Sequence, residues 1–69
     1  SSEFFRSPGD ASGRRILSCS YGNATANCAA KTADSFCKSG GWGGSASQTQ
    51  ETVNGRVYLA DVLCTRTGY

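Results

Sequence analysis

The chain has 69 residues, four cysteines, no histidine and a formal net charge of +2. This length allows one domain with a small hydrophobic core, and such domains usually need disulfides, a metal or a partner chain for stability. The absence of histidine excludes Ser-His-Asp and Cys-His catalytic arrangements and mixed Cys/His zinc sites. The seven basic residues are dispersed, which does not fit the dense basic stripe of a nucleic-acid-binding protein.

The cysteines available for cross-links are Cys19, Cys28, Cys37 and Cys64. They are separated by 8, 8 and 26 residues, whereas structural zinc sites normally use close pairs such as C-x2-C. The spacing therefore favours two disulfides, which persist in oxidising compartments. The chain also lacks methionine and has no apolar run near the ~20 residues that span a bilayer. We expect a secreted or periplasmic protein without a transmembrane segment, its signal peptide already removed.

Two parts are expected along the chain: an N-terminal arm over residues 1–14 and a single disulfide-stabilised domain over residues 15–69. The arm is polar and rich in turn-forming residues, except at Phe4 and Phe5. Two adjacent aromatic residues in a polar arm favour docking onto the domain, and the alternative is a frayed terminus.

The first half of the domain reads as a strand followed by a helix. Residues 16–21 alternate as in a short strand, which Gly22 ends. Asn23 is a suitable N-cap for the helix-forming residues 24–38. This helix is amphipathic, with a mostly alanine face that allows close approach to a sheet, and Gly40-Gly41 ends it.

The second half reads as two strands joined by a hairpin. Residues 45–52 carry no large apolar side chain, which indicates an exposed edge strand. Asn54-Gly55 favours a type I′ turn because both residues tolerate positive φ. Residues 57–64 are apolar on both faces, which is typical of a central strand. The expected fold is α+β, of order β-α-β-β, with a three-stranded antiparallel sheet ordered first, third, second strand and one helix on one face.

The expected helix restricts how the cysteines pair. Cys28 and Cys37 would lie about 13 Å apart along its axis, whereas a disulfide needs Cα atoms within about 7 Å. The preferred pairs are therefore Cys37–Cys64, from the apolar helix face to the last strand, and Cys19–Cys28, closing a short local loop. The alternative is Cys19–Cys37 with Cys28–Cys64.

The two faces of the last strand separate by alternation. We assign to the helix the face with Tyr58, Ala60, Val62 and Cys64, and to the opposite face Val57, Leu59, Asp61 and Leu63. A bare apolar patch of this kind is unusual on a monomer. Either Phe4 and Phe5 fold back over it, or it binds a protein partner or a second copy of the chain. Asp61 faces water at the sheet margin or pairs with Arg15 or Arg66.

No pattern of catalytic residues is visible. The five carboxylates are scattered, and residues 40–44 lack the lysine and the strand-to-helix context of a phosphate-binding loop. The triplet Asn23-Ala24-Thr25 matches a glycosylation sequon, although a capping role for Asn23 explains it better. We expect no enzyme activity, no metal, no cofactor and no nucleic-acid partner.

From residue 26 to residue 64 the chain resembles small exported bacterial proteins in which an alanine-rich helix closes with Phe-Cys before a glycine-aromatic turn and a hairpin. The matching pieces are Ala29, Ala33, Phe36-Cys37, Gly41-Trp42 and Val62-Leu63-Cys64. The chain is also similar to small disulfide-linked α/β effectors and toxins secreted by fungi. The resemblance implies a Cys37–Cys64 bridge and export, and implies no catalytic residues.

Two functions follow as hypotheses. The first is an exported protein-binding module, an inhibitor or an envelope accessory protein. Its binding residues are expected on the sheet, in the arm or in the glycine-rich turn: Val57, Leu59, Leu63, Phe4, Phe5 and Trp42. Trp42 has a competing structural role, closing the open end between helix and sheet. The alternative is a secreted toxin or effector that acts on foreign cells or membranes, although the helix lacks a basic face flanked by bulky apolar residues.

Overall fold

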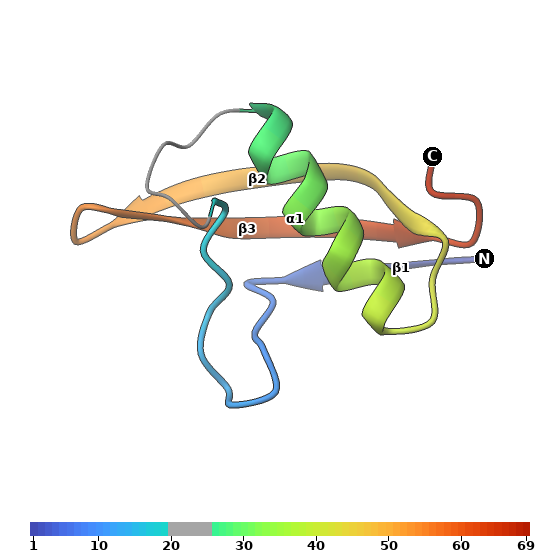
Figure 1. Cartoon of the computed structure of the whole chain (residues 1–69), viewed down its shortest axis with the longest axis horizontal. Coiled ribbons are helices and arrows are strands. Elements are labelled where there is room, and N and C mark those ends of the chain that lie inside the picture. The colour runs from blue at the N-terminus through green and yellow to red at the C-terminus, as the bar shows by residue number, and fades with distance from the viewer. Residues whose placement is uncertain (20–25) are drawn as a thin grey trace.

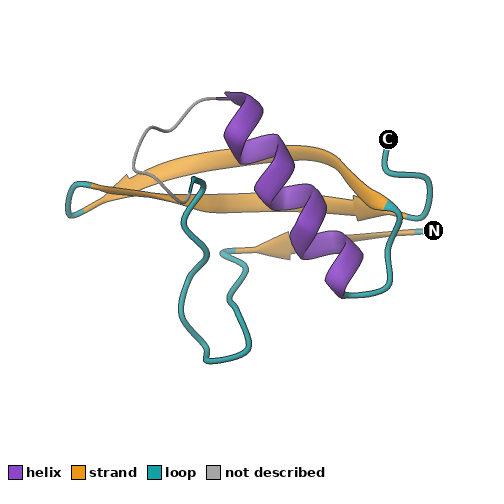
Figure 2. Cartoon of the chain, viewed as in Figure 1, coloured by secondary structure: helices purple, strands orange, loops and turns teal. Residues whose placement is uncertain are grey.

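A computed structural model of the chain describes residues 1–19 and 26–69. One helix lies across a three-stranded antiparallel sheet, as Figures 1 and 2 show. In chain order the elements are β1 (Ser2–Arg6), α1 (Ala26–Ser39), β2 (Gly44–Val53) and β3 (Arg56–Thr65). The sheet order is β1-β3-β2, with β3 in the centre. The predicted α+β class, the β-α-β-β order and the sheet order are confirmed.

The first strand is not the one that the sequence pattern predicts. Residues 2–6, assigned to the arm, form β1, and Phe4 of this strand lies opposite Leu63 of β3. Of the predicted strand 16–21, the described part forms only an isolated bridge, between Leu17 and Tyr58. The prediction was wrong because both segments compete for the same edge of β3, and local alternation does not reveal which one takes most of it.

Residues 16–18 nevertheless continue the sheet beyond the end of β1. The Leu59 N–H donates to the Ile16 carbonyl at 3.0 Å, and the Ser18 N–H donates to the Val57 carbonyl at 3.0 Å. Both bonds lie on the edge of β3 that pairs with β1 at residues 61–65. Two segments of the chain, β1 and residues 16–18, therefore share the strand position on this side of β3.

Between these two segments the chain makes an excursion over residues 7–15, which projects from the body in Figure 1. Asp10 organises it: its Oδ1 accepts hydrogen bonds from the Ser12 N–H at 2.9 Å, the Ser12 hydroxyl at 2.6 Å and the Arg14 N–H at 3.1 Å. Gly9 and Arg15 form an antiparallel bridge that closes its base. The excursion is therefore a hydrogen-bonded loop, which fixes where Arg15 leaves it.

Hydrogen bonds from the residues that follow the helix explain why it ends at Ser39. The predicted cap Asn23, the turn at Gly22 and residues 24 and 25 of the predicted helix lie outside the described residues. At its C-terminus, the Trp42 N–H donates to the Cys37 carbonyl at 3.0 Å and the Gly41 N–H donates to the Lys38 carbonyl at 3.1 Å. This pair of bonds is a Schellman motif, and Gly41 occupies its left-handed position with φ of 91°. The predicted end at Gly40-Gly41 is confirmed.

The hairpin between β2 and β3 follows the prediction closely. Asn54 and Gly55 have φ of 52° and 78°, as a type I′ turn requires, and Val53 pairs with Arg56 across it. β2 lies at the sheet edge, as its lack of large apolar residues indicates. The local turn chemistry therefore sets the register at this end of the sheet.

Two irregularities change which side chains share a face. Gln48 pairs with Val62 and Gln50 with Leu59, so β3 has one more residue than β2 between these pairs. This β-bulge shifts the alternation, and Leu59 and Val62 both lie on the helix side although they are three residues apart. A second shift lies between Ser45 and Ser47 of β2. The register is therefore not uniform along the hairpin.

Disulfides join both layers of the molecule in the predicted pairing. Cys37–Cys64 connects α1 to β3, with Cα atoms 5.4 Å apart. Cys19–Cys28 connects the segment that follows residues 16–18 to α1, with Cα atoms 5.5 Å apart. The buried core lies between helix and sheet: Ala29, Ala33, Cys37, Leu59, Val62 and Cys64. Since two of its six members are half-cystines, covalent bonds supply much of what a small core lacks.

Candidate binding face

The sheet has one face under α1 and one face that the helix does not cover. Val62 and Cys64 pack under the helix, so alternation places Leu63 on the opposite side. Register then brings the neighbouring positions of β1 and β2 to that same side. We call this surface the helix-free face and define it by Phe4, Thr49, Glu51, Tyr58, Asp61 and Leu63.

Part of the predicted binding set lies in the core instead. Leu59 is fully buried, because the bulge after it turns its side chain towards the helix. Phe5 packs edge-to-face on Phe36 of α1, with ring centroids 5.1 Å apart. Both residues therefore contribute to packing between the sheet and the helix.

The other predicted binding residues are scattered over three places. Phe4 is 58% exposed on the helix-free face and lies opposite the half-buried Leu63. Val57 is half-buried and, by alternation with Leu59, lies on the helix side. Trp42 is half-buried and packs against the core beyond the end of α1, as expected for its structural role. Of this set, the structure brings together Phe4 and Leu63.

The predicted face assignment of β3 therefore needs correction. Val62 and Cys64 lie under the helix as expected, but Leu59 joins them. By the same alternation Tyr58 lies on the helix-free face, where Arg15 contacts its ring. A single extra residue in β3 accounts for both errors, because alternation holds on each side of a bulge and reverses across it.

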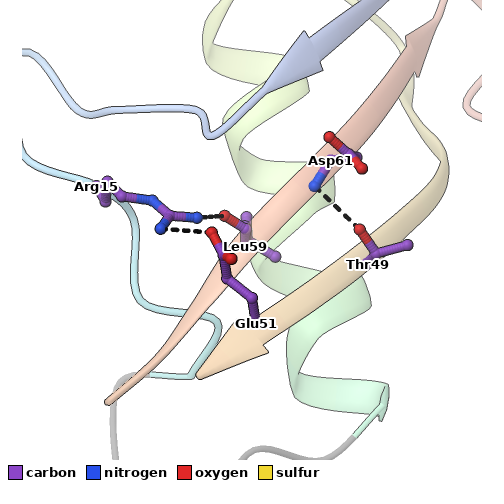
Figure 3. A network of polar contacts seen from close by, with 5 residues as sticks. All are labelled: Arg15, Thr49, Glu51, Leu59 and Asp61. Atoms are coloured by element: carbon purple, nitrogen blue, oxygen red, sulfur yellow. Dashed lines mark hydrogen bonds and ion pairs between the residues drawn. The ribbon is translucent and has the colours of Figure 1, made fainter. Parts of the chain in front are cut away.

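Arg15 has the most polar contacts on the helix-free face, and its partners were not predicted from the sequence, which offered it only as one possible partner of Asp61. Its Nη1 lies 2.6 Å from Glu51 Oε1, and its Nη2 donates to the Leu59 carbonyl at 2.9 Å (Figure 3). The guanidinium carbon lies 5.0 Å from the centre of the Tyr58 ring. Arg15 therefore pairs with Glu51 of β2, and not with Asp61.

This arrangement crosses the whole sheet. Arg15 comes from the segment beside one edge of β3, lies over Tyr58 of β3, and reaches Glu51 of β2 beyond the other edge. The Arg15 side chain is 29% exposed and that of Glu51 is 47% exposed, so the ion pair alone contributes about 0–1 kcal/mol. Its geometric effect is larger, because three fixed partners hold the guanidinium in one place. In the sequence, the adjacent pair of arginines at 14 and 15 was the feature that could have indicated this site.

Asp61 is half-buried, and the contact that the structure shows for it is made by its backbone. Its backbone N–H donates to the hydroxyl of Thr49 at 3.1 Å (Figure 3), and in register it lies opposite Arg6 of β1. Thr49 thus satisfies a backbone donor at the bulge. Among the described residues, the ion pair with Arg66 that the sequence allowed does not form.

Two carboxylates, those of Asp10 and Asp34, have a lowered pKa, and both accept hydrogen bonds from other residues of the domain. The hydroxyl and N–H of Ser12 hold the pKa of Asp10 below its ordinary value. The backbone N–H of Ser45, which donates to Asp34 at 2.7 Å, lowers the pKa of Asp34 and ties α1 to the start of β2. Each carboxylate is occupied by bonds within the fold.

No protein-family model, curated protein or solved structure matches this chain. The structure shows a small β-α-β-β domain with two disulfides, and these bonds point to an oxidising, extracytoplasmic environment. Within residues 1–19 and 26–69, the single helix is too short and too polar to cross a bilayer.

Proposed function

We propose that this chain is a secreted or periplasmic protein-binding module that contacts its partner through the helix-free face. The observation that carries the proposal is Phe4, a large aromatic side chain on the edge strand β1 that is 58% exposed beside Leu63 on this face. Burying such a side chain at an interface is worth roughly 1.5–3 kcal/mol. The fold does not need it for its own core, which lies on the other side of the sheet.

The chemistry around Phe4 supports the same function. Tyrosine and arginine are the residue types enriched at binding hot spots, and Tyr58 and Arg15 occupy this face in a fixed arrangement. Because Glu51 and the Leu59 carbonyl already hold Arg15, little side-chain entropy would be lost on binding. A preorganised aromatic and cationic surface of this kind favours recognition of another protein.

A membrane-active toxin has weaker support. The apolar side chains of α1, among them Ala29, Ala33 and Phe36, pack against the sheet and β1. The helix could expose them to lipid only by leaving the sheet, which the Cys37–Cys64 bond opposes. We also propose no catalytic role, since the perturbed carboxylates Asp10 and Asp34 are engaged in local hydrogen bonds.

The test is partner capture from the culture fluid or envelope fraction of the source organism. The immobilised wild-type protein is compared with Phe4→Glu and with Tyr69→Glu, a matched control at a C-terminal tyrosine that is 87% exposed. Both variants should fold, because surface substitutions usually change stability by less than about 0.5 kcal/mol. Circular dichroism checks this.

We expect a protein that the wild type and Tyr69→Glu retain and that Phe4→Glu loses. Retention by all three proteins would move binding to another surface, and capture of no protein at all would refute the binding function. Sedimentation of the purified chain distinguishes a second copy as the partner, because a dimer through this face would also be lost in Phe4→Glu. Leakage of dye from vesicles at micromolar protein would favour the toxin.

A further inference from the structure

A cleft of about 340 Å³ lies at one end of the helix-free face, where the hairpin end of β3 meets the excursion loop. It is lined by Asp10, Arg14, Arg15, Leu17, Arg56 and Tyr58. Three of these six residues are arginines, from two segments far apart in the sequence. The composition therefore differs from that of the rest of the surface, over which the basic residues are dispersed.

Two of the five charges in and beside the cleft are acidic, and both are already engaged. Glu51 pairs with Arg15, and Asp10 accepts three hydrogen bonds from within its own loop. Arg14 and Arg56 are exposed, and within the described parts of the chain neither has an ion-pair partner. Hydrogen bonds do not neutralise the Asp10 carboxylate, which also attracts Arg14, so the three arginines and the two carboxylates leave a net charge of +1 in and beside the cleft.

The cleft also offers apolar surface. Leu17 is 43% exposed, although its neighbour Ile16 packs against the core. The Tyr58 ring is half-buried and held by the Arg15 guanidinium. An exposed leucine beside an aromatic ring and two arginines is suited to a ligand that combines negative charge with an apolar side chain.

The walls of the cleft are preorganised. The Asp10 N–H donates to the Arg14 carbonyl at 2.8 Å, and the bridge between Gly9 and Arg15 closes the base of the excursion loop. On the other wall, Leu17 bridges to Tyr58. Binding would therefore lose little backbone conformational entropy, and most of the entropy loss would come from ordering the arginine side chains.

We propose that this cleft binds an acidic segment of the partner protein, with carboxylates at Arg14 and Arg56 and an apolar side chain against Leu17 and Tyr58. This inference rests on the proposed function and specifies the partner's chemistry. A polyanion such as nucleic acid or an anionic membrane fits less well, because it needs a continuous basic surface. Lys31 and Lys38 are placed on α1, which lies on the other side of the sheet.

The experiment is an NMR titration of the ¹⁵N-labelled chain with the end-capped peptide Gly-Glu-Leu-Glu-Gly and with its lysine counterpart, Gly-Lys-Leu-Lys-Gly. We expect saturable shifts at the amides of Leu17, Arg56 and Tyr58 with the glutamate peptide and none with the lysine peptide. The double variant Arg14→Ser/Arg56→Ser should bind on the order of tenfold more weakly. Lys31→Gln/Arg66→Gln, which loses the same charge elsewhere, should bind as the wild type does.

Shifts that are spread over the surface, equal shifts with the lysine peptide, or equal losses in the two double variants would overturn the proposal. The proposal would also be overturned if the chain bound a heparin fragment or phosphatidylglycerol vesicles more tightly than the glutamate peptide, and if both double variants weakened that binding equally. If the glutamate peptide does not bind while a partner is still captured through Phe4, the proposal of an acidic segment is refuted and the protein-binding function is not. If it binds at the cleft but no partner is captured, the binding function fails and the anion-binding cleft stands.

Discussion

Removing the Cys37–Cys64 disulfide should destabilise the protein more than removing Cys19–Cys28. The bonds join residues 27 and 9 positions apart. With the loop-entropy relation, the longer loop corresponds to about 3.5 kcal/mol and the shorter one to about 2.6 kcal/mol at 25 °C. The free energy of unfolding of a 69-residue domain is about 3–10 kcal/mol. Loss of the longer bridge alone therefore removes between about a third and all of this free energy.

Packing acts in the same direction as loop entropy. Cys37 and Cys64 are 1% and 0% exposed in the centre of the core, so replacing them by alanine removes buried atoms and leaves a void. In the shorter bridge Cys19 is also buried, at 4% exposed, but Cys28 is half-buried. The difference between the two bridges should therefore exceed the roughly 1 kcal/mol that loop length alone gives.

The assay is guanidinium unfolding of Cys37→Ala/Cys64→Ala and of Cys19→Ala/Cys28→Ala, followed by circular dichroism. The two double variants are matched, because each loses two sulfur atoms and one cross-link. Sucrose, which favours the compact state, restores a folded baseline if the weaker variant is largely unfolded in buffer. An equal or larger loss for Cys19→Ala/Cys28→Ala would refute the reasoning, because both loop length and burial predict the opposite order.

Three further predictions concern single residues. Leu59→Ala should lower the free energy of unfolding by about 2–5 kcal/mol and Phe4→Ala by less than about 0.5 kcal/mol, as urea unfolding would measure; equal losses would contradict the face assignment. Gly43→Ala should prevent stable folding, because its Cβ would overlap the backbone carbonyl of Arg66, whereas Gly13→Ala, with φ of 86° and open space around it, should lose roughly 1–2 kcal/mol in thermal melts. Asp34→Asn should flatten the pH dependence of stability: the hydrogen bonds from Ser45 hold the Asp34 pKa below its ordinary 3.8, so their contribution is present above that pH and is lost as the pH falls through the folded-state pKa. Urea midpoints of Asp34→Asn that run parallel to those of the wild type below about pH 4 would refute this.

The excursion loop decides how the candidate site is built. The chain leaves the edge of β3 after Arg6, which lies opposite Asp61, and returns to the same edge at Ile16, opposite Leu59, two residues nearer the start of β3. The return places Arg15 over Tyr58 and Leu17 beside the cleft. The N-terminal residues that sequence reasoning treated as an arm therefore shape the candidate site, through β1 and through the loop that follows it.

The sequence alone determined the features that depend on near neighbours. Asn54-Gly55 specified the hairpin through positive φ, and Gly40-Gly41 specified the helix end. The length of the helix excluded Cys28–Cys37, and the apolar face of the helix favoured Cys64 over Cys19 as the partner of Cys37, which the structure confirms. The doubly apolar run in β3 identified the central strand, and from it the sheet order followed.

The tertiary structure decided which segment pairs with the free edge of β3, because two segments of the chain satisfy the same backbone groups. It also decided where the bulge falls, and this placed Leu59 in the core and Tyr58 on the helix-free face. The partner of Arg15 depended on both outcomes. Hydrogen bonds between distant residues and a one-residue change of register leave no trace in local alternation, so the candidate binding site could not be predicted before the strands were in place.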